Sequence, residues 1–201
     1  SLSEDKSQIE SISNILDRTL SNIENLYINK NSFVGVSSGF YDLDMKTSGF
    51  QKSQMILIAA RPSMGKTTFS LNIAENVAIK DKKTVLIFSL EMSKEQLTNK
   101  LISSITKIDM QKLQTGMLDD SDLDKLASGI GTLADAKIFI DDTPNISISE
   151  MRAKCRKIKF SNEIDLIIID YLQLMSGNTR TESRQQEVSE ISRFIKALSK
   201  E

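Results

Sequence analysis

The sequence predicts an α/β protein whose sheet is mostly parallel and is covered by helices on both faces. Short runs rich in Ile, Leu and Val alternate with longer segments in which apolar residues recur every three or four positions. The short runs are apolar without a break, which is typical of parallel strands that are buried on both faces. The chain has 201 residues, of which 39% are hydrophobic and 26% charged, and this is enough to bury a core.

Residues 1–34 are predicted to form a separate segment built around one amphipathic helix. Their apolar residues follow one another at helical spacing: Ile9, Ile12, Leu16, Leu20, Ile23 and either Leu26 or Tyr27. The polar residues 29–32 predict a connector after this helix. Taken by itself, the pattern fits a helix that packs on its own domain or one that docks on another subunit.

Residues 35–201 are predicted to form the α/β domain. Its strands are expected at 55–59, 84–90, 137–141 and 166–170, and its helices at 67–80, about 94–106, 121–134, 147–160 and 185–201. The first strand, 55–59, is expected to be buried. The chain ends within the last predicted helix, without a cap, and we therefore expect a fragment of a longer protein.

Composition excludes several kinds of site. The chain has no histidine and one cysteine, so a Cys/His zinc site, a histidine-based triad and an internal disulfide are excluded. The 26 basic and 27 acidic residues nearly balance, so a polyanion would be held by a local patch. The apolar runs are too short for a transmembrane helix and no secretory signal opens the chain, so we expect a cytoplasmic protein.

Residues 60–67 match the phosphate-binding loop pattern, except that Ala60 replaces the first glycine. Successive backbone N–H groups of such a loop wrap an anion, and the N-terminus of the following helix adds a positive partial charge. Gly65 lets the backbone approach a phosphate, Lys66 reaches the β- and γ-phosphates, and the Thr67 hydroxyl binds Mg²⁺. The residues expected to bind nucleotide are Ala60, Arg61, Pro62, Ser63, Met64, Gly65, Lys66, Thr67 and Thr68.

Carboxylates at the ends of predicted strands are candidates for the metal and for catalysis. Asp170 follows an apolar run at the carboxyl end of a strand, where open α/β sheets bind ligands, and is expected to hold Mg²⁺ directly or through water. Asp141 and Asp142 are the rival pair, although the Thr-Pro-Asn that follows them is typical of a turn. Glu91 ends the second predicted strand and is the candidate general base toward the γ-phosphate, with a surface glutamate as the alternative.

Together these motifs resemble one family, the RecA-like C-terminal motor domain of bacterial DnaB-type replicative helicases. The most specific matches are Arg-Pro-Ser-Met-Gly-Lys-Thr at 61–67 and Asp-Tyr-Leu-Gln-Leu-Met at 170–175. Further matches lie at 38–50, 88–92 and 184–193, in family order, so the resemblance covers most of the chain. It implies a RecA-like P-loop fold and ATP-driven translocation on single-stranded DNA with duplex unwinding.

The resemblance also implies roles for individual residues and segments. Glu91 and Lys66 would act in catalysis, and Thr67 and Asp170 would bind Mg²⁺. Residues 9–27 would form a linker helix that docks on the neighbouring subunit of a homo-hexamer. Arg180 and Arg184 would lie on a loop facing the DNA channel.

The resemblance further implies parts that lie outside these 201 residues. The family carries an N-terminal primase-interacting domain, and a C-terminal part with its arginine finger and main DNA-binding loop. We therefore expect primase and a helicase loader as partners of the longer protein, and weak activity of this fragment alone.

Other nucleotide-binding classes share parts of the pattern. A RecA-like recombination or repair ATPase would need filament-forming and strand-exchange segments, which we do not identify. A small-molecule kinase would need an arginine-rich lid, and none is apparent between 92 and 136. A non-catalytic nucleotide switch would need a replacement of Lys66 or Glu91, and both are present.

Overall fold

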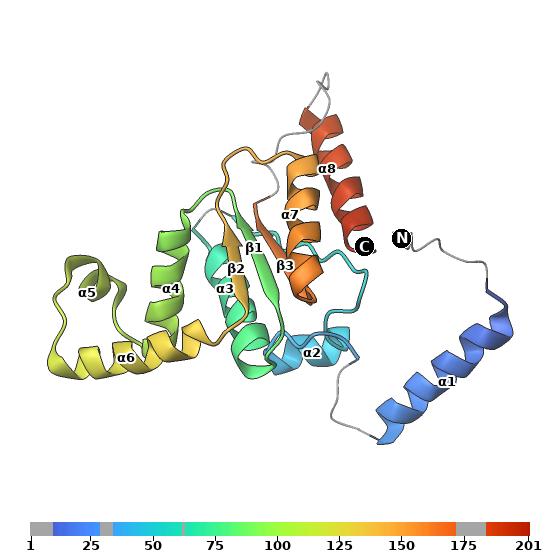
Figure 1. The fold of residues 1–201 in the computed structure, drawn as a ribbon, viewed down its shortest axis with the longest axis horizontal. Helices are drawn as coiled ribbons and strands as arrows, with labels where there is room; N and C mark the ends of the chain where they lie inside the picture. The colour runs from blue at the N-terminus through green and yellow to red at the C-terminus, as the bar shows by residue number, and fades with distance from the viewer. Residues whose placement is uncertain (1–9, 29–33, 62, 172–183) are drawn as a thin grey trace. The chain divides into compact units, whose positions relative to one another are not determined.

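The computed structural model describes residues 10–28, 34–61, 63–171 and 184–201, without the side chains of Arg184 and Glu187 (Figure 1). The chain divides into two compact units, residues 1–34 and 35–201. Within the described ranges, no helix combines the length and the apolar character needed to cross a lipid bilayer.

In the first unit the predicted amphipathic helix is present as α1 (Ile12–Ile28). Its 17 residues make a helix shorter than the six turns suggested by the spacing, and Ile9 lies outside the described residues. None of its residues is buried. The exposed apolar side chains of α1 include Ile12, Ile15, Leu16, Leu20 and Ile23.

The second unit is built on a parallel sheet whose strands, among the described residues, are β1 (Val85–Ser89), β2 (Ile138–Asp141) and β3 (Leu166–Asp170). The strand order is β2-β1-β3, with β1 in the centre. In the register, Phe88 pairs with Asp141 and Ser89 pairs with Asp170. The carboxyl ends of the three strands therefore meet at one edge of the sheet.

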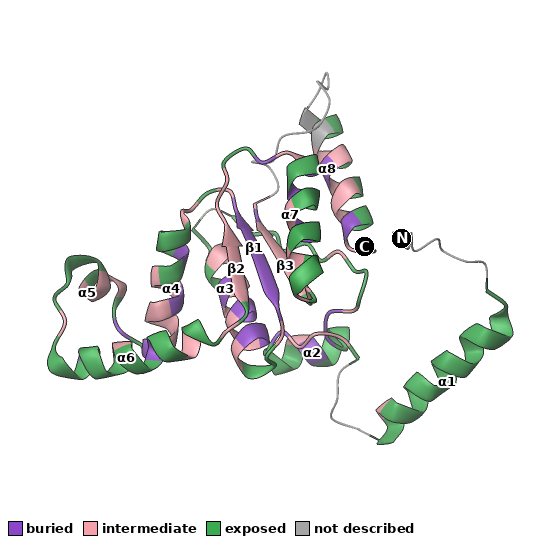
Figure 2. Cartoon of the chain, in the orientation of Figure 1, coloured by how far each residue is buried: buried purple, intermediate pink, exposed green. Residues whose placement is uncertain are grey.

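Helices cover both faces of this sheet, as predicted. Alternate residues of β1 belong to two separate clusters of buried side chains. The first cluster contains Val85 and Ile87, and the second contains Leu86 and Phe88. The helices that contribute to the first cluster are α3 (Lys66–Glu75), η1 (Asn76–Lys80) and α4 (Lys94–Thr106), and those of the second are α7 (Ile148–Ser161) and α8 (Arg184–Leu198). Figure 2 shows the buried centre of the sheet between these layers.

Capping residues explain where several of the predicted helices begin. Ser93 and Ser147 each form a capping box with the residue three positions on, at the starts of α4 and α7. Asp119 does the same for α6 (Asp120–Ala134). The predicted helix 67–80 is α3 continued by the π-helix η1.

Two short helices were not predicted, α2 (Tyr41–Thr47) and α5 (Met110–Thr115). They have 7 and 6 residues, too few to show a helical period. The buried Asp44 carboxylate of α2 accepts hydrogen bonds from Ser37 Oγ (2.7 Å), Ser38 N (2.8 Å) and Gly39 N (3.2 Å). Burial raises the pKa of Asp44, but these hydrogen bonds outweigh it and hold the pKa below its usual range.

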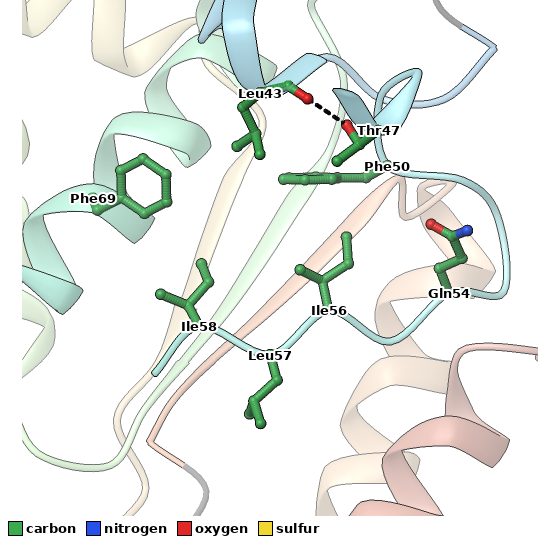
Figure 3. Close-up of a pocket in the computed structure, with 8 residues that line it drawn as sticks. All are labelled: Leu43, Thr47, Phe50, Gln54, Ile56, Leu57, Ile58 and Phe69. Carbon is green, nitrogen blue, oxygen red and sulfur yellow. Dashed lines mark hydrogen bonds between the residues drawn. The ribbon is translucent and has the colours of Figure 1, made fainter. Parts of the chain in front are cut away.

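The predicted buried strand at 55–59 is wrong. These residues form no ladder with any strand that the structure describes, and Ile56, Leu57 and Ile58 are 46%, 71% and 36% exposed. Figure 3 shows the segment extended, with Ile56 and Ile58 on the side of Phe50 and Phe69 and with Leu57 on the opposite side. An apolar run becomes a buried strand only when its backbone finds a neighbour. Within the described part of the chain, the outer edge of β3 also has no paired strand.

Candidate nucleotide site

Residues 60, 61 and 63–65 lie in the loop between the extended segment and α3. Ser63 and Gly65 both have left-handed backbone conformations, with φ of 63° and 84°. A Cβ atom added to Gly65 would meet no atom within 4 Å, so packing does not require glycine there. The positive φ does favour glycine, and the open space leaves the backbone accessible. Pro62 lies outside the described residues.

The loop leads directly into α3, where Lys66 is the first residue and Thr67 the second. The N–H of Met64 donates to the carbonyl of Arg61 (3.2 Å), and the N–H of Phe69 donates to the carbonyl of Gly65 (2.9 Å). The first N–H groups of a helix have no partner within the helix and carry its positive partial charge. The expected strand is missing before the loop, but the expected helix N-terminus is present.

Asp170 meets both functional side chains of the loop. Its Oδ1 lies 2.8 Å from Nζ of Lys66, and its Oδ2 accepts a hydrogen bond of 2.5 Å from Oγ1 of Thr67. Asp170 is only 6% exposed, so water screens this ion pair little. Lys66 Nζ also lies 4.0 Å from the centre of the Tyr171 ring. Lys66 and Thr67, predicted from the loop, and Asp170, predicted from the strand end, therefore form one polar cluster.

Glu91 lies at the same edge of the sheet. It is exposed and follows Leu90, whose N–H donates to the main-chain carbonyl of Asp170 (2.7 Å). The backbone that carries Glu91 is thus fixed beside the backbone of the strand that carries Asp170. The carboxylate of Glu91 is available for chemistry at this edge.

The rival carboxylates at the end of β2 have other partners. Asp141 accepts hydrogen bonds from Nζ of Lys154 (2.5 Å) and from the N–H of Thr143 (3.1 Å). Burial raises the pKa of Asp141, but these interactions outweigh it and hold the pKa below its usual range. Asp142 accepts from the N–H of Lys94 (3.0 Å), and this bond is the main cause that holds its pKa low.

The remaining predicted site residues contribute less to this cluster. Ala60, Arg61, Ser63, Met64 and Thr68 are exposed. Arg180 lies outside the described residues, and Arg184 begins α8 without a described side chain. Among the described residues, no group of three or more acidic, histidine or cysteine side chains could hold a metal ion.

Sequence reasoning missed two residues of this edge, Tyr171 and Ser89. Tyr171 directly follows the predicted metal carboxylate, so its position was a signal that could have been used. Ser89 had no comparable signal, because its contacts depend on the turn after β1.

The sheet is parallel and covered on both faces, and a glycine-containing loop opens a helix beside a strand-end aspartate. Together these features define a P-loop α/β protein. The chain belongs to the DnaB-like helicase C-terminal domain family, whose model matches residues 35–201.

Similar proteins agree with this assignment. Replicative DNA helicase DnaB of Geobacillus stearothermophilus is 50% identical over 193 residues, which are 96% of this chain and 42% of that protein. Replicative DNA helicase DnaC of Bacillus subtilis is 47% identical over 196 residues, which are 97% of this chain and 43% of that protein. The chain thus spans about two fifths of the length of these curated relatives.

Solved structures are similar over nearly the whole chain. One of them, described as an ATPase domain, is 34% identical, with a TM-score of 0.87, and the match covers 96% of this chain and 68% of that one. A DnaB-like replicative helicase, described with its interactions with primase, is also 34% identical, with a TM-score of 0.83. This match covers 96% of this chain and 46% of that one.

Proposed function

We propose that this chain is the ATP-hydrolysing motor domain of a replicative DNA helicase. The observation that carries the proposal is the contact of one carboxylate, Asp170, with both Lys66 and Thr67. In P-loop proteins a lysine and a hydroxyl at these loop positions serve the phosphates and the metal, and a strand-end aspartate completes the metal site. The family membership supports the same function.

The residues of the cluster take separate roles in this proposal. The N-terminus of α3 and the loop N–H groups receive the phosphates, and Lys66 exchanges its bond with Asp170 for the β- and γ-phosphate oxygens. Glu91 accepts the proton of the attacking water as the general base. The flanking loop residues from Ala60 to Thr68 contact the nucleotide through their backbone.

The donor set fits Mg²⁺. The Thr67 hydroxyl and the Asp170 carboxylate are two oxygen donors 2.5 Å apart, and Mg²⁺ prefers a few protein oxygens together with phosphate oxygens and water. When bound, Mg²⁺ neutralises charge on the phosphates. Thr67 and Asp170 would hold it.

The division at residue 34 supports a proposal for assembly. Residues 1–34 act as a linker segment, and α1 docks through its exposed apolar face on the next subunit of a homo-hexamer. Residues 35–201 form the ATPase core. Arg180 and Arg184 contact single-stranded DNA. The partners of the longer protein are primase and a helicase loader. The longer protein acts in the cytoplasm.

The test is steady-state ATP hydrolysis by the full-length protein with and without single-stranded DNA, together with unwinding of a forked duplex. A motor of this kind shows DNA-stimulated turnover and unwinding. Stimulation without unwinding would favour a recombination ATPase. Phosphoryl transfer to a small molecule, with no response to DNA, would favour a kinase. Residues 1–201 alone are expected to bind ATP and hydrolyse it slowly.

A further inference from the structure

The turn that carries Glu91 is closed by a buried serine. Ser89, the last residue of β1, is 2% exposed. Its Oγ donates a hydrogen bond to the carbonyl of Met92 (2.6 Å) and accepts one from the N–H of Met92 (3.3 Å). Because both bonds join one side chain to one residue three positions along, they fix the path of the chain through Leu90 and Glu91.

The same turn is anchored on both faces of the sheet. Leu90 packs against the cluster that includes Phe88 and residues of α7 and α8, whereas Met92 packs against the cluster that includes Leu97 and other residues of α3 and α4. Glu91, between them, is exposed. The hydrogen bond from the N–H of Leu90 to the carbonyl of Asp170 fixes the position of the turn relative to the carboxyl end of β3.

The hydroxyl of Ser89 is the polar group at the end of a buried, apolar strand. Residues Val85 to Phe88 of β1 are all buried and apolar, and a buried hydroxyl costs free energy unless it is hydrogen-bonded. Alanine would avoid that cost. Both of these hydrogen bonds of the Ser89 side chain go to Met92, so the hydroxyl serves the turn that holds Glu91.

We infer that Ser89 is a positioning residue for Glu91, one that sets the carboxylate relative to Asp170 and the loop of α3. The inference rests on the proposed role of Glu91 as general base. Ser89 acts only through the turn from Leu90 to Met92. Small errors in the position of a catalytic group are costly, because a misplacement of about 1 Å can lower a rate about 100-fold.

The experiment is a double-mutant cycle in the full-length protein, with turnover and ATP affinity measured separately. We expect Ser89→Ala to lower kcat at least about tenfold and to change the affinity for ATP less than about twofold. In a Glu91→Gln background, Ser89→Ala should cause no further loss of kcat, because the group that it positions is already gone. Ser89→Thr, which keeps a hydroxyl, should retain most of the turnover.

The matched control is Ser103→Ala. Ser103 Oγ also donates to a main-chain carbonyl a few residues on, that of Ile108 (2.7 Å), but this turn joins α4 to α5. Its loss should leave kcat unchanged. Thermal unfolding of each variant checks the fold. Ser89→Cys has the same shape as serine, with a larger and more weakly donating atom in place of the oxygen, and replaces Ser89→Ala if that variant does not fold.

Two outcomes would overturn the inference while leaving the proposed function intact. One is normal turnover in Ser89→Ala beside slow turnover in Glu91→Gln. The other is an equal fractional loss of turnover from Ser89→Ala in both backgrounds, which a general structural defect would produce. Normal turnover in Glu91→Gln would instead overturn the role of Glu91 and, with it, this inference.

Discussion

Lys66 and Asp170 form an ion pair with 2.8 Å between Nζ and Oδ1, although they belong to different elements, α3 and β3. The pair holds the lysine at the start of the helix where an anion would bind. It also compensates a carboxylate that is nearly buried. Nucleotide binding therefore has to exchange one partner of Lys66 for another, and the free energy of binding includes the cost of that exchange.

Replacement of Lys66 by alanine should remove most of the affinity for ATP. Only backbone N–H groups and the bound cation would then compensate the phosphates, and loss of a charge-assisted hydrogen bond costs about 1.5–3 kcal/mol, roughly 10–100-fold in affinity. Isothermal titration of the full-length protein measures this. Lys157→Ala, which removes an exposed lysine from α7, is the control. Unchanged affinity in Lys66→Ala would contradict the assignment of the loop.

Replacement of Glu91 by glutamine should leave ATP binding intact and slow hydrolysis by about 10²–10⁴-fold. Glutamine keeps the shape of the side chain and cannot accept the proton. Titration with ATP, followed by single-turnover hydrolysis of the bound nucleotide, separates the two effects. Lost binding with normal turnover of the bound fraction would show that Glu91 has another role.

Asp170→Asn and Asp141→Asn should differ in their effect on the metal. Asp170 contacts Thr67, whereas Asp141 is held by Lys154, so only Asp170→Asn should raise the Mg²⁺ concentration needed for half-maximal ATP hydrolysis. Asp141→Asn removes one partner of a local pair and should lower the melting temperature. Equal Mg²⁺ dependence in the two variants would leave the end of β2 as a rival metal site.

The apolar face of α1 should be needed for assembly. Three apolar side chains of this helix are exposed: Ile12, Leu16 and Ile23. Full burial of each side chain in an interface would contribute about 1.5–3 kcal/mol to the free energy of association. Changing all three to serine in the full-length protein should disperse hexamers and leave the subunit folded. Light scattering and circular dichroism measure the two properties.

The control variant for α1 replaces three polar residues of the same helix with serine: Asp17, Asn22 and Asn25. This variant should remain hexameric. If the apolar variant also remained hexameric, or if it unfolded, the helix would instead pack within its own subunit.

Asp44→Asn should destabilise the protein at neutral pH and much less in acid. The folded-state pKa of Asp44 lies below its unfolded value, so the charge contributes stability above the ordinary pKa of about 4. That stability is lost as the pH falls through the lowered pKa that Asp44 has in the folded protein. Urea unfolding at pH 7 should show a loss of about 1–3 kcal/mol in the variant. An equal difference in strong acid would contradict this origin.

Much of the fold follows from local sequence. The strands at 85–89, 138–141 and 166–170 are marked by unbroken apolar runs, and α4 and α7 begin at serines that cap them. Asp170 was predictable because strand ends in parallel sheets collect ligands. These features depend on a few neighbouring residues.

Features that depend on distant partners were not predictable. The apolar run 55–59 resembles a buried strand, but its state depends on a strand beside it. The partners of Asp141 and Asp142 depend on how α7 and α4 pack on the sheet. Ser89 contacts its turn only because β1 ends where it does.

The outer edge of β3 has a practical consequence for anyone who purifies residues 1–201. No strand among the described residues pairs with this edge, and the molecule also exposes the apolar residues Ile56 and Leu57. Unprotected sheet edges recruit strands from other molecules. Concentrated solutions should therefore self-associate through β-pairing, and solubility should rise when lysine replaces Leu57, whose side chain points away from Phe50 in Figure 3.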